Sequence, residues 1–245
     1  MSCALCLKKL PLCNSHILPE LFYKPIYDEH LHRYFAISTE TEKKPIPRQK
    51  GIWEKLLCIG CERKLNNWET NASRLFYKEA KVLEKSDRLE VVDIDYSSFK
   101  LFQMSMLWRT GVSSRVEFNN VSLGPHSDRL RRMLFDEDPG DPDEYGCLLV
   151  LCPTYKDILQ QMLISPDMVK VDDHHVVRFL LAGLFWNYFV TSHTPEIASD
   201  GVFLSKEGVL TILVESKYTS QYAEKLYKRL KESGNIDRVI KKKDA

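Results

Sequence analysis

Two short cysteine motifs decide how this sequence folds. The first lies in CALCLKKLPLCNSHILPE, residues 3–20, and the second opens CIGCERKL, residues 58–65. A Cys-x-x-Cys turn places two sulfur atoms on one side of a metal ion, and two such turns complete a tetrahedral site. The two motifs therefore predict a structural zinc ion bound by Cys3, Cys6, Cys58 and Cys61.

Other interpretations of the cysteines stay open. The four could be buried thiols or a redox pair, although no strand–helix–strand pattern typical of a redox motif surrounds residues 1–10. Cys13 or His16 could replace one of the zinc ligands. Cys147 and Cys152 flank an apolar run and are expected to be core thiols.

No segment of the sequence predicts export or insertion into a membrane. The longest apolar stretch, residues 179–190, contains Asn187 and is shorter than the roughly 20 residues that a membrane-spanning helix needs. The N-terminus lacks the apolar core of a signal peptide. We therefore expect a cytoplasmic protein with no membrane partner, in a reducing compartment where clustered cysteines favour metal binding over disulfides.

The charge of the chain is unevenly distributed. With 35 Lys and Arg against 34 Asp and Glu among 245 residues, the net charge of +1 excludes a histone-like binder that is basic throughout. Residues 1–82 nevertheless carry 14 basic and 9 acidic side chains, whereas residues 83–245 carry 21 and 25. The candidate nucleic-acid contacts in the basic part are Lys43, Lys44, Arg48, Lys50, Lys55, Arg63 and Lys64.

Hydrophobic periodicity predicts an α+β protein. Apolar residues at spacings of three and four predict a helix from about Cys61 to Leu83, opened by the second cysteine motif. Further helices are expected over residues 96–110, after Gly124-Pro125 and over residues 219–233. Strand-like runs cover residues 147–152, 176–191 and 202–215, of which the middle one is also long enough for a helix.

This order of elements predicts two units. In a treble-clef zinc site, one ligand pair comes from an N-terminal turn and the other from the first turn of a helix, which is the order found here. We expect such a module over residues 1–82, with a loop or irregular hairpin at residues 29–50. A larger mixed α/β domain of unknown role follows over residues 83–245.

The motifs carry a resemblance to a known family. A Cys-x-x-Cys turn, then Ser15-His16-Ile17-Leu18-Pro19, then a second turn that opens a helix resembles the zinc-containing branch of the HNH endonucleases. The later stretch SMLWRTGVSSRVEFNNVSLGPHSDRLRRML, residues 105–134, is similar to uncharacterised bacterial proteins described as HNH-like. The resemblance implies an HNH-like ββα arrangement within the treble-clef module.

The resemblance also implies a mechanism. His16 falls on the general base that takes a proton from water attacking a phosphodiester, while a catalytic Mg²⁺ or Mn²⁺ stabilises the leaving oxygen. Ser15 falls where the family has a charged or imidazole metal ligand. Glu62 falls where many members have a metal-binding His or Asn, so it is the expected ligand of the catalytic cation. The Asn that orients the catalytic His has no counterpart between residues 30 and 57.

Two functional hypotheses follow. The first is an HNH-type endonuclease that acts on DNA or RNA in a role such as bacterial anti-phage defence. Its basic N-terminal module would bind the phosphates of the nucleic acid. The second is a non-catalytic zinc-containing adaptor with a degenerate HNH site, whose residues 83–245 bind a protein partner.

Overall fold

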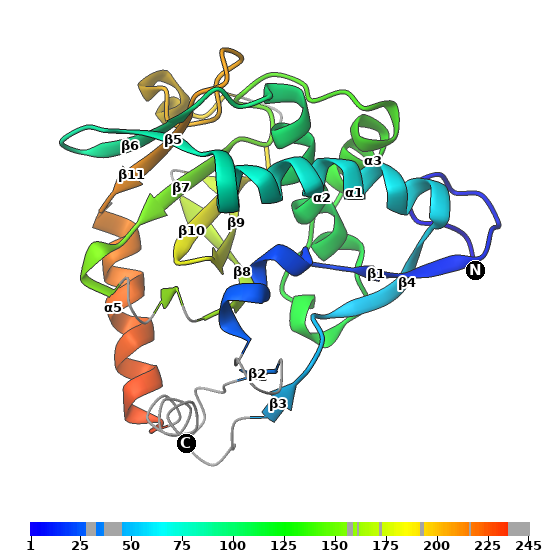
Figure 1. The fold of residues 1–245 in the computed structure, drawn as a ribbon, viewed down its shortest axis with the longest axis horizontal. Helices are drawn as coiled ribbons and strands as arrows, with labels where there is room; N and C mark the ends of the chain where they lie inside the picture. Colours follow the sequence, from blue (N-terminus) through cyan, green and yellow to red (C-terminus); the bar gives the residue numbers. More distant parts are fainter. Residues whose placement is uncertain are drawn as a thin grey trace.

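The computed structural model describes residues 1–27, 33–36, 46–155, 159–160, 162–171, 173–191, 194–215 and 217–234 (Figure 1). Two of the predicted nucleic-acid contacts, Lys43 and Lys44, lie outside these ranges. The described chain is a mixed α/β structure built around a seven-stranded sheet, as the periodicity predicted.

The N-terminal cysteine motifs flank a two-stranded antiparallel ladder. Strand β1 (Leu12–His16) pairs with β4 (Trp53–Cys58), and helix α1 (Ile59–Arg74) begins directly after β4. The helix buries Leu65, Trp68 and Ala72 along one face. Four short elements connect the two strands: the 3₁₀ turns η1 (Glu20–Phe22) and η2 (Lys24–Ile26), and the antiparallel pair β2 (Tyr34–Ala36) and β3 (Ile46–Arg48).

The predicted helix over residues 61–83 is too long at its C-terminal end. After α1 comes a π-helical turn, η3 (Leu75–Glu79), and residue Ala80 has an extended backbone. Strand β5 (Lys81–Glu84) then pairs with β6 (Arg88–Val92) in a hairpin. The helical spacing continued by chance through Ala80 and Leu83, whereas pairing with β6 decides the local conformation.

The sheet follows the order β5-β6-β11-β7-β10-β9-β8, in which β11 and β7 are parallel and all other neighbours are antiparallel. Its remaining strands are β7 (Cys147–Leu151), β8 (Ile164–Val171), β9 (His174–Leu181), β10 (Leu184–Phe189) and β11 (Leu210–Val214).

The strand-like runs of the sequence are resolved as follows. The run at 147–152 is β7. The ambiguous run at 176–191 forms β9 and β10, joined by a turn in which Ala182 and Gly183 both have positive φ. In the third run, residues 202–215, only the last part is the strand β11. The sequence reading missed β8 and the β5–β6 hairpin.

The helices of the larger part confirm the periodicity. They are α2 (Tyr96–Val112), α3 (His126–Asp136) and α5 (Lys217–Glu232). Three short 3₁₀ turns accompany them: η4 (Val116–Phe118), η5 (Pro153–Tyr155) and η6 (Glu196–Asp200). Among the described residues, no helix is both long and apolar enough to cross a membrane.

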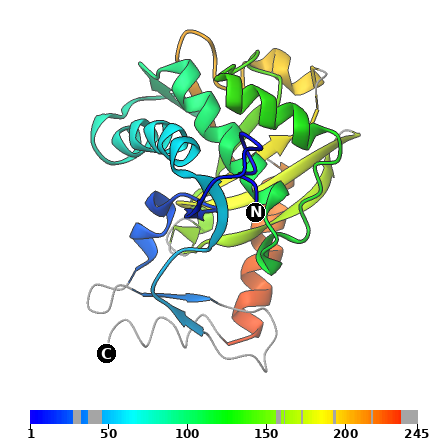
Figure 2. The same ribbon diagram turned by 90° about the vertical axis from the view of Figure 1, so that its right-hand side faces the viewer.

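Alternating side chains place the sheet between two layers. Leu149 and Trp186 join the large core cluster that includes α2, whereas Val150 and Phe185 join a second cluster with Ala223 of α5. Figures 1 and 2 accordingly show α1, α2 and α3 on one side of the sheet and α5 on the other. The large cluster runs from Cys3 to Ile212, so the two predicted units share one hydrophobic core.

Helix α2 lies at the centre of this core, since every residue from Ser98 to Thr110 is buried. Its Arg109, only 1% exposed, joins three elements. The guanidinium donates from Nη1 to the carbonyl oxygen of His16 on β1 at 2.7 Å and contacts Glu69 Oε1 on α1 at 2.7 Å. Its Nε donates to the carbonyl oxygen of Ser105 one helical turn earlier.

Arg109→Met is expected to lower the free energy of unfolding by about 3 kcal/mol, because it leaves the Glu69 carboxylate and a buried carbonyl without their donor. Urea denaturation followed by circular dichroism measures the change. Arg132→Met on α3 is the control, since that side chain is 64% exposed and its ion pair with Asp128 is screened. Equal loss in the two variants would contradict the structural role of Arg109.

Candidate metal centre and adjoining basic cleft

Four cysteines converge at the junction of the N-terminal turn, β4 and α1. The ligand atoms of Cys3, Cys6, Cys58 and Cys61 all lie within 4.8 Å of one another, and the Cys6 and Cys58 sulfurs are 3.8 Å apart. Tetrahedral zinc with Zn–S bonds of about 2.3 Å requires sulfur–sulfur distances of about 3.8 Å. The cluster could therefore hold a metal ion such as zinc.

Backbone hydrogen bonds shape the first cysteine turn. The amide of Cys3 donates to Lys8 and the amide of Leu7 donates to Cys3, with Leu7 in the left-handed region at φ 62°. The amide of Ala4 donates to the carbonyl of Leu56 on β4, which joins the turn to the strand that carries the second motif. The short-range sequence pattern and this one long-range bond together bring the two motifs into contact.

The electrostatics of the cluster also favour a cation. Burial acts to raise the pKa of the Cys3 thiol, but backbone hydrogen bonds from Cys58, Cys6 and Leu5 outweigh it and lower that pKa to about 7. Burial and the neighbouring thiols Cys3 and Cys58 raise the pKa of Cys61. Four sulfurs this close repel one another as thiolates, and a bound metal ion removes that repulsion.

The other cysteines lie apart from this cluster. Cys147 and Cys152, at most 2% exposed, belong to the core around β7, as expected for core thiols. Within the described ranges, the four-cysteine cluster is the single group of three or more His, Cys, Asp or Glu residues with metal-binding geometry. Cys13 and His16 are not members of it.

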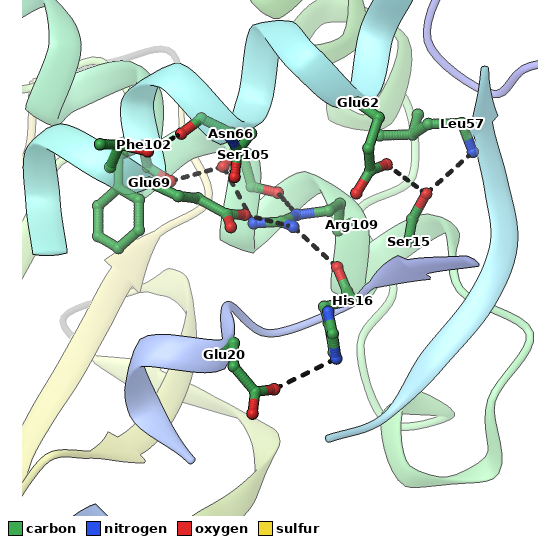
Figure 3. Close-up of polar contacts among 11 residues, drawn as sticks. Ser15, His16, Glu20, Leu57, Glu62, Asn66, Glu69, Phe102, Ser105 and Arg109 are labelled. Atoms are coloured by element: carbon green, nitrogen blue, oxygen red, sulfur yellow. Dashed lines mark hydrogen bonds and ion pairs between the residues drawn. The ribbon is translucent and has the colours of Figure 1, made fainter. Parts of the chain in front are cut away.

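Ser15 and Glu62 meet between β1 and α1. The Ser15 hydroxyl donates to Glu62 Oε2 at 2.6 Å and accepts a bond from the Leu57 amide, and the Ser15 side chain is fully buried (Figure 3). Burial raises the pKa of the Glu62 carboxyl, while the Ser15 hydrogen bond and the nearby Arg109 guanidinium act in the opposite direction. The two positions that the HNH resemblance assigned to metal ligands are thus adjacent.

His16 belongs to a different network. Its Nε2 lies 3.2 Å from Glu20 Oε2, and the other Glu20 oxygen accepts a bond from the Tyr27 hydroxyl. Figure 3 shows the His16 ring on the opposite side of β1 from Glu62, as the alternation of neighbouring strand residues requires. The structure therefore separates the two predicted catalytic residues. The Glu20 oxygen beside His16 is within ion-pair distance of the imidazole, but it has no hydrogen-bond partner among the described residues.

The predicted basic contacts fall into separate groups. Lys64 turns toward α3, where its ammonium donates to the carbonyl of Phe135 and pairs with Glu137. Lys55 donates to the carbonyl of Leu12 on β1, and Arg63 is exposed on α1. Only two of the described basic positions, Arg48 and Lys50, line a common surface.

That surface is a cleft of about 330 Å³ at the start of β4. It is lined by Arg48, Gln49, Lys50, Gly51, Ile52, Trp53 and Arg115. Arg115 follows α2 in the chain, and sequence reasoning missed it because nothing local connects it to residues 48–53. Glu117 lies 3.7 Å from Arg48 and 4.0 Å from Arg115, so a single carboxylate faces both guanidinium groups.

Trp53, one of the residues that line the cleft, shares a face of the β1–β4 ladder with His16. Trp53 is the cross-strand partner of His16, so their side chains project to the same side. Glu54, the next residue, projects to the other face and accepts bonds from the Ser113 hydroxyl and from the amide and hydroxyl of Ser114. Residues 113–115 are thereby held against β4.

Comparisons of the chain with protein-family models, with curated proteins and with solved structures find no match. The resemblance to HNH endonucleases therefore rests on the motifs alone. What the structure adds is a four-cysteine centre, a buried Ser15–Glu62 pair, a His16–Glu20 pair and a basic cleft.

Purified protein is expected to carry about one equivalent of zinc, which Cys58→Ser removes because three thiolates and a hydroxyl bind zinc far more weakly. Elemental analysis after gel filtration measures the ratio. Cys152→Ser is the matched control, since this thiol is buried away from the cluster and its variant should keep the metal. Full zinc content in Cys58→Ser would contradict the four-cysteine site.

Proposed function

We propose that this chain is a zinc-containing, nucleic-acid-binding protein whose N-terminal module is an HNH-like treble clef with a degenerate catalytic site. The order of the module supports the fold assignment: a cysteine turn, then β1 and β4, then α1 with its ligand in the first turn. The zinc ion would connect the N-terminal turn to the start of α1 and so hold the β1–β4 ladder in place.

The basic cleft carries the proposal of nucleic-acid binding. Three cationic side chains, Arg48, Lys50 and Arg115, line it together with an exposed aromatic ring. Guanidinium groups suit phosphate because their planar donors match its oxygens, and an ammonium adds a point charge. Within the part of the chain that the structure describes, Glu117 is the acidic residue that pairs with Arg48 and Arg115.

The residues at the HNH metal position do not fit a catalytic Mg²⁺ or Mn²⁺. Hard divalent cations prefer several charged oxygen ligands, but the pair here is one carboxylate and one neutral hydroxyl. One oxygen of that carboxylate already accepts a hydrogen bond from the Ser15 hydroxyl. The buried Arg109 guanidinium adds a fixed positive charge near Glu62, which disfavours a second cation. We therefore assign a structural role to the Ser15–Glu62 pair.

A second candidate function is phosphodiester hydrolysis with His16 as general base. The His16–Glu20 pair favours it, since a carboxylate beside a histidine stabilises the positive charge that the ring gains when it acts as a general base. This pair lies on the face of the ladder that carries Trp53.

Lys50→Glu is expected to weaken binding of a short fluorescent oligonucleotide by an order of magnitude or so, and to reduce the slope of log affinity against log salt by about one phosphate contact. Fluorescence anisotropy over a salt series measures both. Lys225→Glu on the exposed face of α5 makes the same charge change away from the cleft and should leave binding unchanged. Equal binding by Lys50→Glu and wild type would contradict the assignment of the cleft.

Cleavage assays separate the two functions. With Mg²⁺ or Mn²⁺ added, the wild-type protein is expected to bind DNA and RNA without cutting them, because the Ser15–Glu62 pair lacks the charge to hold the cation. Cutting that disappears in His16→Ala and falls in Glu20→Gln would select the hydrolase instead. Arg132→Ala, on α3, is the control for both variants.

A further inference from the structure

The basic cleft has an aromatic wall that distinguishes it from a general phosphate-binding surface. Trp53 is 41% exposed, whereas Trp68, Trp108 and Trp186 are at most 5% exposed. A large aromatic ring at the surface, beside three cations, offers both a stacking platform and charge.

The floor of the cleft is held in one shape. The amide of Ile52 donates to the hydroxyl of the buried Tyr23 at 3.2 Å. Gly51 lies so close to that ring that a Cβ atom there would be 2.6 Å from a Tyr23 carbon. Backbone and ring are therefore in contact, which leaves the floor little freedom to move.

Hydrogen bonds also hold the segment that carries Arg115. The Glu54 carboxylate accepts three hydrogen bonds from Ser113 and Ser114, at 2.7 to 3.0 Å. The Arg115 amide in turn donates to the Ser113 hydroxyl. These bonds occupy both oxygens of Glu54 and fix the position of the segment that carries Arg115.

The volume of the cleft limits the size of its ligand. A volume of about 330 Å³ is at the lower end of the range for small-molecule sites, about 300–1,000 Å³, which suits one nucleotide. In a duplex the faces of the bases are covered by their neighbours, so only an unpaired base can lie against an indole ring.

Resting on the proposed function, we propose that this cleft binds one unpaired nucleotide of a single-stranded nucleic acid. The base stacks on the indole of Trp53, and the adjoining phosphate is held by Arg115 and Lys50. The protein therefore distinguishes single strands and unpaired ends from uninterrupted duplex.

The test is binding of matched single-stranded and blunt duplex oligonucleotides, in DNA and in RNA, at one salt concentration. We expect single strands to bind roughly tenfold more tightly and to quench tryptophan fluorescence, because Trp53 is the exposed indole. The Trp53→Ala variant should bind single strands about tenfold more weakly than the wild type, and its affinity for duplex should change little. Trp53→Phe should keep most of the affinity and lose the quenching.

Phe135→Ala is the matched control, since Phe135 is also an aromatic side chain that is 41% exposed, and it lies on α3. It should bind both ligands like the wild type. Zinc content and circular dichroism verify that every variant is folded.

Equal affinity for single strand and duplex, with no effect of Trp53→Ala, would overturn the stacking site. The proposed function would still stand in that case if Lys50→Glu weakens binding. Absence of binding to every oligonucleotide would overturn the proposed function itself.

Discussion

The mutual repulsion of four cysteine sulfurs is the constraint on which the N-terminal half of this protein depends. Held within 4.8 Å of one another, they favour a cation, and a bound ion would join the first turn of the chain to the start of α1. The β1–β4 ladder begins beside this cluster, since Leu12 of β1 pairs with Cys58 of β4. The ladder then carries the His16–Glu20 pair, the buried Ser15 and one wall of the cleft.

Arg109 extends this constraint to the rest of the molecule. One buried guanidinium contacts β1, α1 and its own helix α2, and so joins the N-terminal ladder and helix to the large core. The same charge has a chemical consequence, since it lies near Glu62 at the position where the resemblance predicts a divalent cation. A charge that stabilises the packing of the module thereby opposes catalysis by a metal at that position.

Local sequence patterns predicted much of the fold. The cysteine spacing, the apolar period of α1 and the composition of α2 act over a few residues, and each predicted element is present. The errors arose where local patterns are ambiguous. The helical spacing ran past residue 79 into a strand, and the β9–β10 hairpin read equally well as a helix, because pairing with distant strands decides both segments.

The sequence by itself predicted the four-cysteine cluster, since two Cys-x-x-Cys turns are typical of metal binding, and it determined the mixed α/β class through hydrophobic period. Only the tertiary structure decided which polar residues act together. It set Ser15 against Glu62, paired His16 with Glu20, and brought Arg115 to Trp53 from 62 positions away in the chain. The physical reason is that burial, charge proximity and cleft shape are set by contacts between distant segments, which no local pattern encodes.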